Sequence, residues 1–197
     1  MNTIEKLKNI SKEKGSIITV AEAELQGISR AVLSNLSKQG KLRRIARGQY
    51  IFPNTLEDEL FSISLRSEKL IFSHETALYL HGISDRTPFI HSVTVPNGYV
   101  PSPATREICK IRYIKPELFE LGKTELLTPA GNKVMAYDLE RTICDIIRSR
   151  SNMGTETFIA ALKEYAKRPD KNLNLLANYA NKMRVSNILQ RYMEVLL

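Results

Sequence analysis

Tryptophan is absent from the 197 residues, and only two cysteines and three histidines occur. Cys109 and Cys144 have no CxxC spacing and no histidine cluster beside them, so we expect neither a disulfide framework nor a zinc site, but two small buried residues. No apolar run approaches the about 20 residues that a membrane-spanning helix needs. The first 15 residues also lack the apolar core of a signal peptide. The sequence therefore predicts a cytoplasmic protein that does not bind membranes.

Several motifs of catalytic and cofactor-binding sites are also missing. The chain contains no Walker loop, no GxGxxG and no GxSxG. His74, Glu75 and His81 suggest a metal site, but the two histidines are seven positions apart and do not form an HExxH motif. We therefore interpret them as ordinary helix residues and predict no metal and no cofactor.

Acidic residues near position 140 leave a nuclease as an alternative. Asp138, Glu140 and Asp145 are the carboxylates that could bind Mg²⁺. However, Asp138 is placed to cap a helix, and Asp145 follows Arg141 by four residues, which is the spacing of a helical ion pair. Both residues thus have structural explanations, and we predict that the protein is not an enzyme and has no catalytic residues.

Positive charge is concentrated near the start of the chain. The net charge is +8, and residues 1–53 hold ten Lys and Arg against four Asp and Glu, whereas residues 54–197 hold nineteen against seventeen. This asymmetry is typical of a segment that binds a polyanion, joined to a nearly neutral domain.

The basic segment has the pattern of a winged helix-turn-helix. Thr3 is a candidate cap for a first helix, and Thr19 with Glu22 forms a capping box for a second. Ser29 can cap a third helix only four residues after the second. Residues 42–46 and 49–52 then indicate two strands joined by Arg47-Gly48, which is typical of a two-residue hairpin.

One face of the third helix has the chemistry of a DNA reader. Val32, Leu33 and Leu36 form an apolar stripe, and small polar and basic side chains lie opposite. Small side chains allow close approach to base edges, and cations reach phosphates. A solvated basic edge without function is the simpler alternative. The predicted DNA-binding residues of this helix and of the hairpin are Arg30, Ser34, Ser37, Lys38, Lys41, Arg43, Arg44 and Arg47.

The rest of the chain predicts an α+β domain at 54–197. We expect a helix over 55–69 with Leu56 on its apolar face, and a helix that starts after a Ser73 cap. Residues 89–96, 107–115 and 124–137 indicate strands of a small, mostly antiparallel sheet, and helices follow to the end of the chain. The predicted fold class is therefore α+β, with an N-terminal winged helix-turn-helix (1–53) followed by a sheet with several packed helices.

The stretches "FSHETALYLHGISDRTPFIHSVTVPNGY" and "YDLERTICDIIRSR", together with the winged-helix segment, give a family resemblance. The chain resembles the AbiEi-type antitoxins of bacterial type IV toxin–antitoxin (abortive infection) systems. The resemblance implies an antitoxin and transcriptional autorepressor that binds inverted repeats in its own promoter and self-associates on that DNA.

It also implies a separately encoded, nucleotidyltransferase-like toxin, which the C-terminal domain neutralises without needing a stable complex. The candidate antitoxin surface consists of cations on the late helices, for which a solvated helical face is the simpler alternative: Lys163, Lys167, Lys182, Arg184 and Arg191. The alternative function is a plain winged-helix transcription factor whose C-terminal domain binds a ligand or dimerises.

Overall fold

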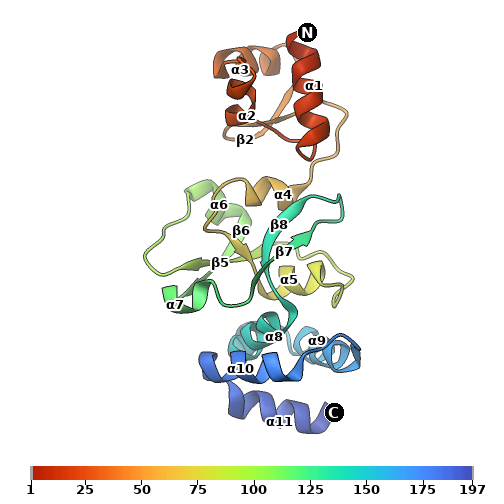
Figure 1. The fold of residues 1–197 in the computed structure, drawn as a ribbon, viewed down its shortest axis with the longest axis vertical. Helices are drawn as coiled ribbons and strands as arrows, with labels where there is room; N and C mark the ends of the chain where they lie inside the picture. Colours follow the sequence, from red (N-terminus) through yellow and green to blue (C-terminus); the bar gives the residue numbers. More distant parts are fainter. Residues whose placement is uncertain (1, 197) are drawn as a thin grey trace. The chain divides into compact units, whose positions relative to one another are not determined.

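The computed structural model describes residues 2–196 and divides them into two compact units (Figure 1). The first unit ends at Leu65 and includes the hairpin tip Thr128–Asn132, and the second comprises Arg66–Leu127 and the chain from Lys133 onward. No helix of the described segment is long and apolar enough to cross a bilayer.

The first unit contains the predicted winged helix-turn-helix. Its elements, in chain order, are α1 (Thr3–Glu13), β1 (Ile18–Thr19), α2 (Val20–Leu25), α3 (Arg30–Lys38), β2 (Arg43–Ala46), β3 (Gln49–Ile51) and α4 (Glu59–Ser64). The three strands pair antiparallel in the order β1-β3-β2. Helices α1 to α3 enclose a core to which Leu7, Leu33 and Tyr50 contribute fully or almost fully buried side chains.

Local signals position these helices. The Thr19 hydroxyl accepts from the Glu22 amide, and the Glu22 carboxylate accepts from the Thr19 amide, which confirms the predicted capping box. The Ser29 hydroxyl caps α3 as predicted. The cap of α1 is Asn2 rather than Thr3, because a capping box with Glu5 starts the helix one residue earlier.

The first compact unit extends beyond residue 53. The side-chain amide of Gln49 donates to the Ser62 carbonyl at 3.0 Å, and the Ser62 hydroxyl donates back at 2.7 Å, so α4 is bonded to β3. Asp58 caps α4 and accepts from the side chains of Thr128 and Asn132. Helix α4 is shorter than the predicted helix 55–69, and Leu56 is 93% exposed because it precedes the cap.

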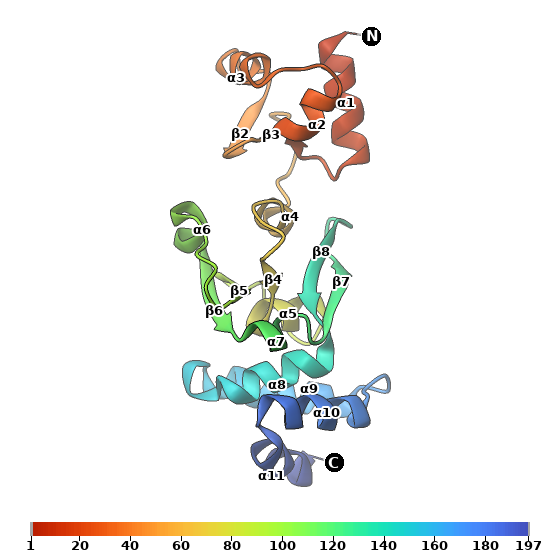
Figure 2. The ribbon, with the colours of Figure 1, turned by 60° about the vertical axis from the view of Figure 1, so that its left-hand side comes forward.

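A mixed sheet forms the centre of the second unit (Figure 2). Its strands are β4 (Ile71–Phe72), β5 (His91–Pro96), β6 (Cys109–Ile114), β7 (Lys123–Leu127) and β8 (Lys133–Tyr137), in the order β6-β5-β4-β8-β7. Pairs β4/β5 and β7/β8 are antiparallel, whereas β4/β8 and β5/β6 are parallel. The α+β class is confirmed, with two parallel pairings in a sheet predicted to be mostly antiparallel.

The parallel β5/β6 pair depends on a helix that we did not predict from the sequence. Helix α6 (Pro103–Ile108) connects the two strands, with Ser102 as its cap and Pro103 at its first position. A parallel pair needs such a crossover, since a tight turn can join only antiparallel neighbours. Two further short helices belong to this part, α5 (His74–Leu80) and α7 (Pro116–Phe119).

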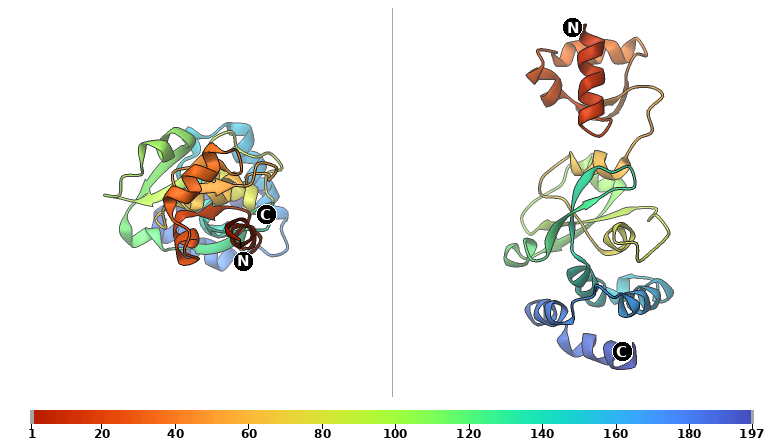
Figure 3. Two further views of the ribbon diagram at one scale, coloured as in Figure 1. Left: turned by 90° about the horizontal axis from the view of Figure 1, so that it is seen from above. Right: turned by 45° about the vertical axis from the view of Figure 1, so that its right-hand side comes forward.

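The C-terminal helices pack together as a separate layer of the second unit (Figure 3). They are α8 (Leu139–Arg148), the short 3₁₀ turn η1 (Arg150–Asn152), α9 (Thr155–Lys167), α10 (Leu173–Met183) and α11 (Ser186–Leu196). Their shared core includes Ile143, Cys144, Leu162 and Ala180, all with no exposed area. Both cysteines are buried, as predicted.

Candidate functional site

Helix α3 presents the predicted reading face to solvent. Arg30, Ser34 and Lys38 recur every four residues, so they lie on one side of the helix, and all three are exposed. Leu33, which lies about 100° around the helix from Ser34, is completely buried. Ser37 is half-buried at the edge of this face, and Val32, expected in the apolar stripe, is 40% exposed, so the buried stripe is narrower than predicted.

The hairpin separates two of the predicted arginines. Arg44 lies opposite Tyr50, which faces the α1–α3 core, whereas Arg43 lies opposite Ile51. Because neighbouring strand residues point to opposite faces, Arg43 and Arg44 project from opposite sides of the sheet. Arg43 also forms an ion pair with Glu57 at 3.4 Å, and Arg44 donates to the Ala46 carbonyl at 3.3 Å. Arg44 is therefore on the face of the sheet that packs against the helices α1 to α3, and Arg43 is on the other.

The remaining basic residues of the segment are available for a ligand. Lys41 and Arg47 are exposed, and Arg47 precedes Gly48, whose φ of +76° allows the two-residue turn. Within the described residues, no ion pair engages Arg30, Lys38, Lys41, Arg44 or Arg47. Exposed cations without carboxylate partners attract a polyanion without first breaking an ion pair.

The histidines considered as metal ligands have other partners. His74 contacts the hydroxyls of Ser73 and Ser149, each at 3.0 Å, and His81 donates to the Tyr137 carbonyl at 2.9 Å. Burial lowers the pKa of both imidazoles. In the described part of the chain, no three His, Cys, Asp or Glu residues are grouped as a metal site would require.

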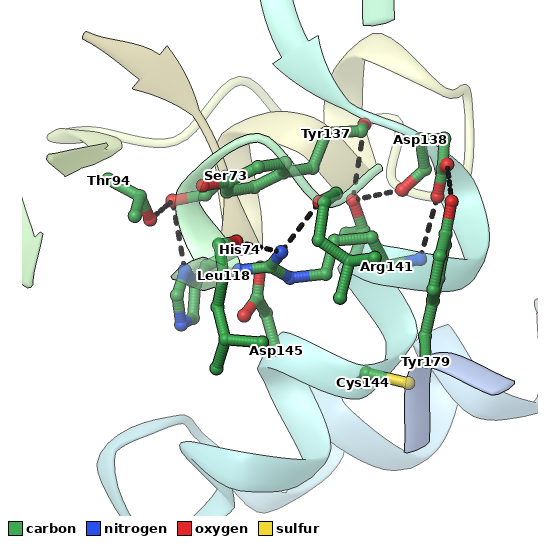
Figure 4. Close-up of polar contacts among 12 residues, drawn as sticks. Ser73, His74, Thr94, Leu118, Tyr137, Asp138, Arg141, Cys144, Asp145 and Tyr179 are labelled. Atoms are coloured by element: carbon green, nitrogen blue, oxygen red, sulfur yellow. Dashed lines mark hydrogen bonds and ion pairs between the residues drawn. The ribbon is translucent and has the colours of Figure 1, made fainter. Parts of the chain in front are cut away.

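Ser73 occupies the predicted cap position of α5, but its side chain does not form the cap hydrogen bond. Its hydroxyl instead accepts from Thr94 at 2.8 Å and contacts the His74 ring, and no side-chain cap bond forms (Figure 4). His74 adopts a φ of +49°, a conformation that few residues other than glycine tolerate. The helix thus begins with a strained histidine that is held by two hydroxyl groups.

The three carboxylates considered as nuclease residues all have hydrogen-bond or ion-pair partners within the protein. Asp138 caps α8 through the Arg141 amide and accepts from the Tyr179 hydroxyl at 2.9 Å (Figure 4). Glu140 accepts from the Asn172 amide and the Tyr165 hydroxyl. Burial raises the pKa of the Asp138 carboxyl despite its hydrogen bonds.

Asp145 belongs to the buried Arg141 cluster, which we define as Arg141, Asp145, Tyr137 and the carbonyls of Leu118 and Leu121. The Arg141 side chain has no exposed area, and its Nε lies 3.2 Å from the Asp145 carboxylate, as predicted for this i, i+4 pair. Its Nη1 donates to the two carbonyls at 2.7 and 2.6 Å, and the guanidinium lies 4.1 Å from the centre of the Tyr137 ring. Burial raises the pKa of the Tyr137 hydroxyl. These contacts connect α7, β8 and α8.

The predicted antitoxin cations are exposed but not gathered in one place. Lys163 and Lys167 lie on α9, where Lys167 pairs with Glu164 at 2.7 Å, and Arg191 lies on α11. Lys182 and Arg184 line a pocket together with three cations that sequence reasoning missed, Lys115, Arg148 and Arg150. No local signal could have found these three, because up to 69 positions separate them from Lys182 and Arg184 in the sequence.

Residues 5–53 match a family model described as "Transcriptional regulator, AbiEi antitoxin". The N-terminal segment is thus similar to this family of regulators. The match confirms the predicted resemblance for this quarter of the chain, and the family is one of regulators rather than of enzymes.

The sequence matches no protein of curated function. The chain is similar in fold to the crystal structure of the RV2827C protein from Mycobacterium tuberculosis, with a TM-score of 0.64 at 14% identity. The alignment covers 91% of this chain and 71% of that chain, so the likeness extends over both units but concerns the fold alone.

Proposed function

We propose that the protein represses its own operon by binding inverted repeats through the first unit, and that the second unit, which makes up most of the predicted C-terminal domain, neutralises a nucleotidyltransferase-like toxin. The observation that supports repression best is the exposed face of α3, in a segment that also carries the exposed Arg44 and Arg47 and matches a family of transcriptional regulators. The antitoxin role is supported by the name of that family.

In this proposal α3 enters the major groove and the hairpin grips the flanking backbone. Ser34 and Lys38 contact base edges, because a short hydroxyl and a long amine both reach donors and acceptors in the groove. Arg44, Arg47 and Lys41 neutralise phosphates. A single winged helix reads a short half-site, so two copies bind an inverted repeat together.

The proposal is tested with full-length variants, since a truncation at residue 53 would cut the bonded β3–α4 pair out of the first unit. The variant R44A/R47A should lose repression of a reporter under the native promoter, yet still rescue growth when the toxin encoded beside it is expressed. The control K163A/K167A, which changes exposed lysines of α9, should repress normally.

Rescue of growth during toxin expression tests whether the second unit acts as an antitoxin. If the wild-type chain represses the reporter but never rescues growth, the protein is a plain transcription factor and the antitoxin half of the proposal is wrong. If R44A/R47A still represses fully, the assigned DNA-binding face is wrong. A variant with alanine at all five candidate antitoxin cations tests that surface separately. If it still rescues growth, these five residues are not the antitoxin surface, but the antitoxin role itself stands.

A further inference from the structure

The basic pocket of the second unit has no role in the proposed repression. It encloses about 500 Å³, within the usual range for small-ligand sites. Helices α7, α8, α10 and α11 and the turn η1 supply its lining. Five cations and one carboxylate, Glu117, surround it, and the cations are Lys115, Arg148, Arg150, Lys182 and Arg184.

Helix stability explains only part of this charge. Arg148 and Lys182 lie in the last turns of α8 and α10, where a cation favours the helix dipole. Lys115, however, precedes the four-residue helix α7 and so is not at a helix C-terminus that a cation would stabilise. Arg184 takes a φ of +59° after α10, a position that glycine occupies with less strain. Arg184 is therefore not the residue that folding alone would favour at this position.

The cations of the pocket also lack carboxylate partners. No ion pair in the described segment involves Lys115, Arg148, Lys182 or Arg184. Arg150 donates one bond, to the Ile147 carbonyl at 3.2 Å. Like charges held in one concave site repel each other, and a polyvalent anion relieves that repulsion.

The pocket has an apolar part beside the cations. Met183 and Val185 are buried, each about 4% exposed, and Leu118 and Ile188 are half-buried. A ligand that fits both parts carries several negative charges on one side and an apolar group on the other.

We propose that this pocket binds a nucleoside polyphosphate, with the cations on the phosphates and Met183, Val185 and Ile188 against the nucleoside. Arginine suits this role because its guanidinium donates two parallel hydrogen bonds to phosphate oxygens. The inference does not depend on DNA binding or on toxin neutralisation.

Isothermal titration of the full-length chain with GTP, ATP and inorganic tripolyphosphate tests the proposal. The variant K115A/R184G should weaken nucleotide binding about tenfold or more, because two charge-assisted contacts are lost. Glycine at position 184 also relieves the backbone strain, so a loss of affinity cannot be assigned to unfolding. The control K163A/K167A removes the same charge outside the pocket, and R44A/R47A removes it from the DNA-binding face. Both should bind nucleotide within about twofold of the wild type.

Three results would overturn the assignment. The first is no saturable binding of either nucleotide, and the second is an equal loss of affinity in K115A/R184G and K163A/K167A. The third is tripolyphosphate binding as tight as that of GTP and ATP, which would leave the nucleoside without a site.

Discussion

Arg44 and Arg47 in the first unit are exposed and lack carboxylate partners among the described residues, whereas Arg141 in the second unit is fully buried beside Asp145. The same residue type thus has opposite uses in the two units. The hairpin arginines are free to contact a ligand, while Arg141 is committed to holding α7, β8 and α8 together. Formal charge alone does not distinguish these uses, but burial and partners do.

The largest expected effect concerns the buried Arg141 cluster. The substitution R141A leaves Asp145 without its ion-pair partner and two carbonyls without donors, and should lower the free energy of unfolding by about 3–5 kcal/mol. Urea denaturation of the full-length protein measures this. R148A, which changes an exposed arginine on the same helix, is the control and should cost less than about 0.5 kcal/mol. Equal urea midpoints for R141A and the wild type would contradict the structural role assigned to Arg141, and with it the contrast with the exposed arginines of the first unit.

The free energy of unfolding should decrease as the pH drops from 7.5 to 5.5. Burial lowers the folded-state pKa of His74 and His81 below the ordinary value of 6.5, so the unfolded chain binds protons that the folded chain does not. This contribution is present above pH 6.5 and is lost below it, at up to about 1.4 kcal/mol per histidine for each further pH unit. Denaturation curves at both pH values measure the loss.

The variants H74Q and H81Q serve as controls for this pH dependence. Each should flatten the difference between pH 7.5 and pH 5.5, even if it lowers stability at both. A wild-type chain that is equally stable at the two pH values would contradict the assignment of two neutral buried imidazoles.

Substitutions on the two faces of the hairpin should have a smaller effect, which is confined to the salt dependence of DNA binding. R44A/R47A should lower the salt dependence of DNA binding by about two units of slope, one for each lost phosphate contact. R43A should change it less, because Arg43 projects from the other face and already pairs with Glu57. Gel-shift titrations at several salt concentrations measure both. A larger effect of R43A would reverse the assignment of the faces.

The smallest effect concerns base recognition by α3. Ser34→Ala and Lys38→Ala should change the preference among DNA sequences by about 1 kcal/mol and affect random DNA little, since base contacts specify and phosphate contacts position. Competition with single-base operator variants measures this preference. Equal losses on operator and random DNA would place Ser34 and Lys38 among the phosphate contacts instead.

The sequence predicted the first unit well because its signals are local. The Thr19–Glu22 capping box and the Arg47-Gly48 turn each act within a few residues of the chain. The i, i+4 pair of Arg141 with Asp145 was predictable for the same reason. Which face of the sheet each of Arg43 and Arg44 takes needed the strand register, which a β-bulge after Arg44 makes irregular.

Tertiary packing decides what the sequence left out. The parallel pairing of β5 with β6 depends on α6. This helix was not predicted, because the strand assigned to residues 107–115 overlaps its end. The pocket cations Lys115, Arg148 and Arg184 come from three distant parts of the chain, and only the packed helices bring them together. The positive φ of His74 likewise follows from its surroundings and not from its residue type.

The salt dependence of wild-type binding to its own upstream DNA tests the central claim most directly. If α3 and the hairpin neutralise five or six phosphates, the logarithm of the affinity should fall against the logarithm of the salt concentration with a slope of about −5. A slope near zero, at any affinity, would contradict the view that the exposed cations of residues 30–47 bind DNA.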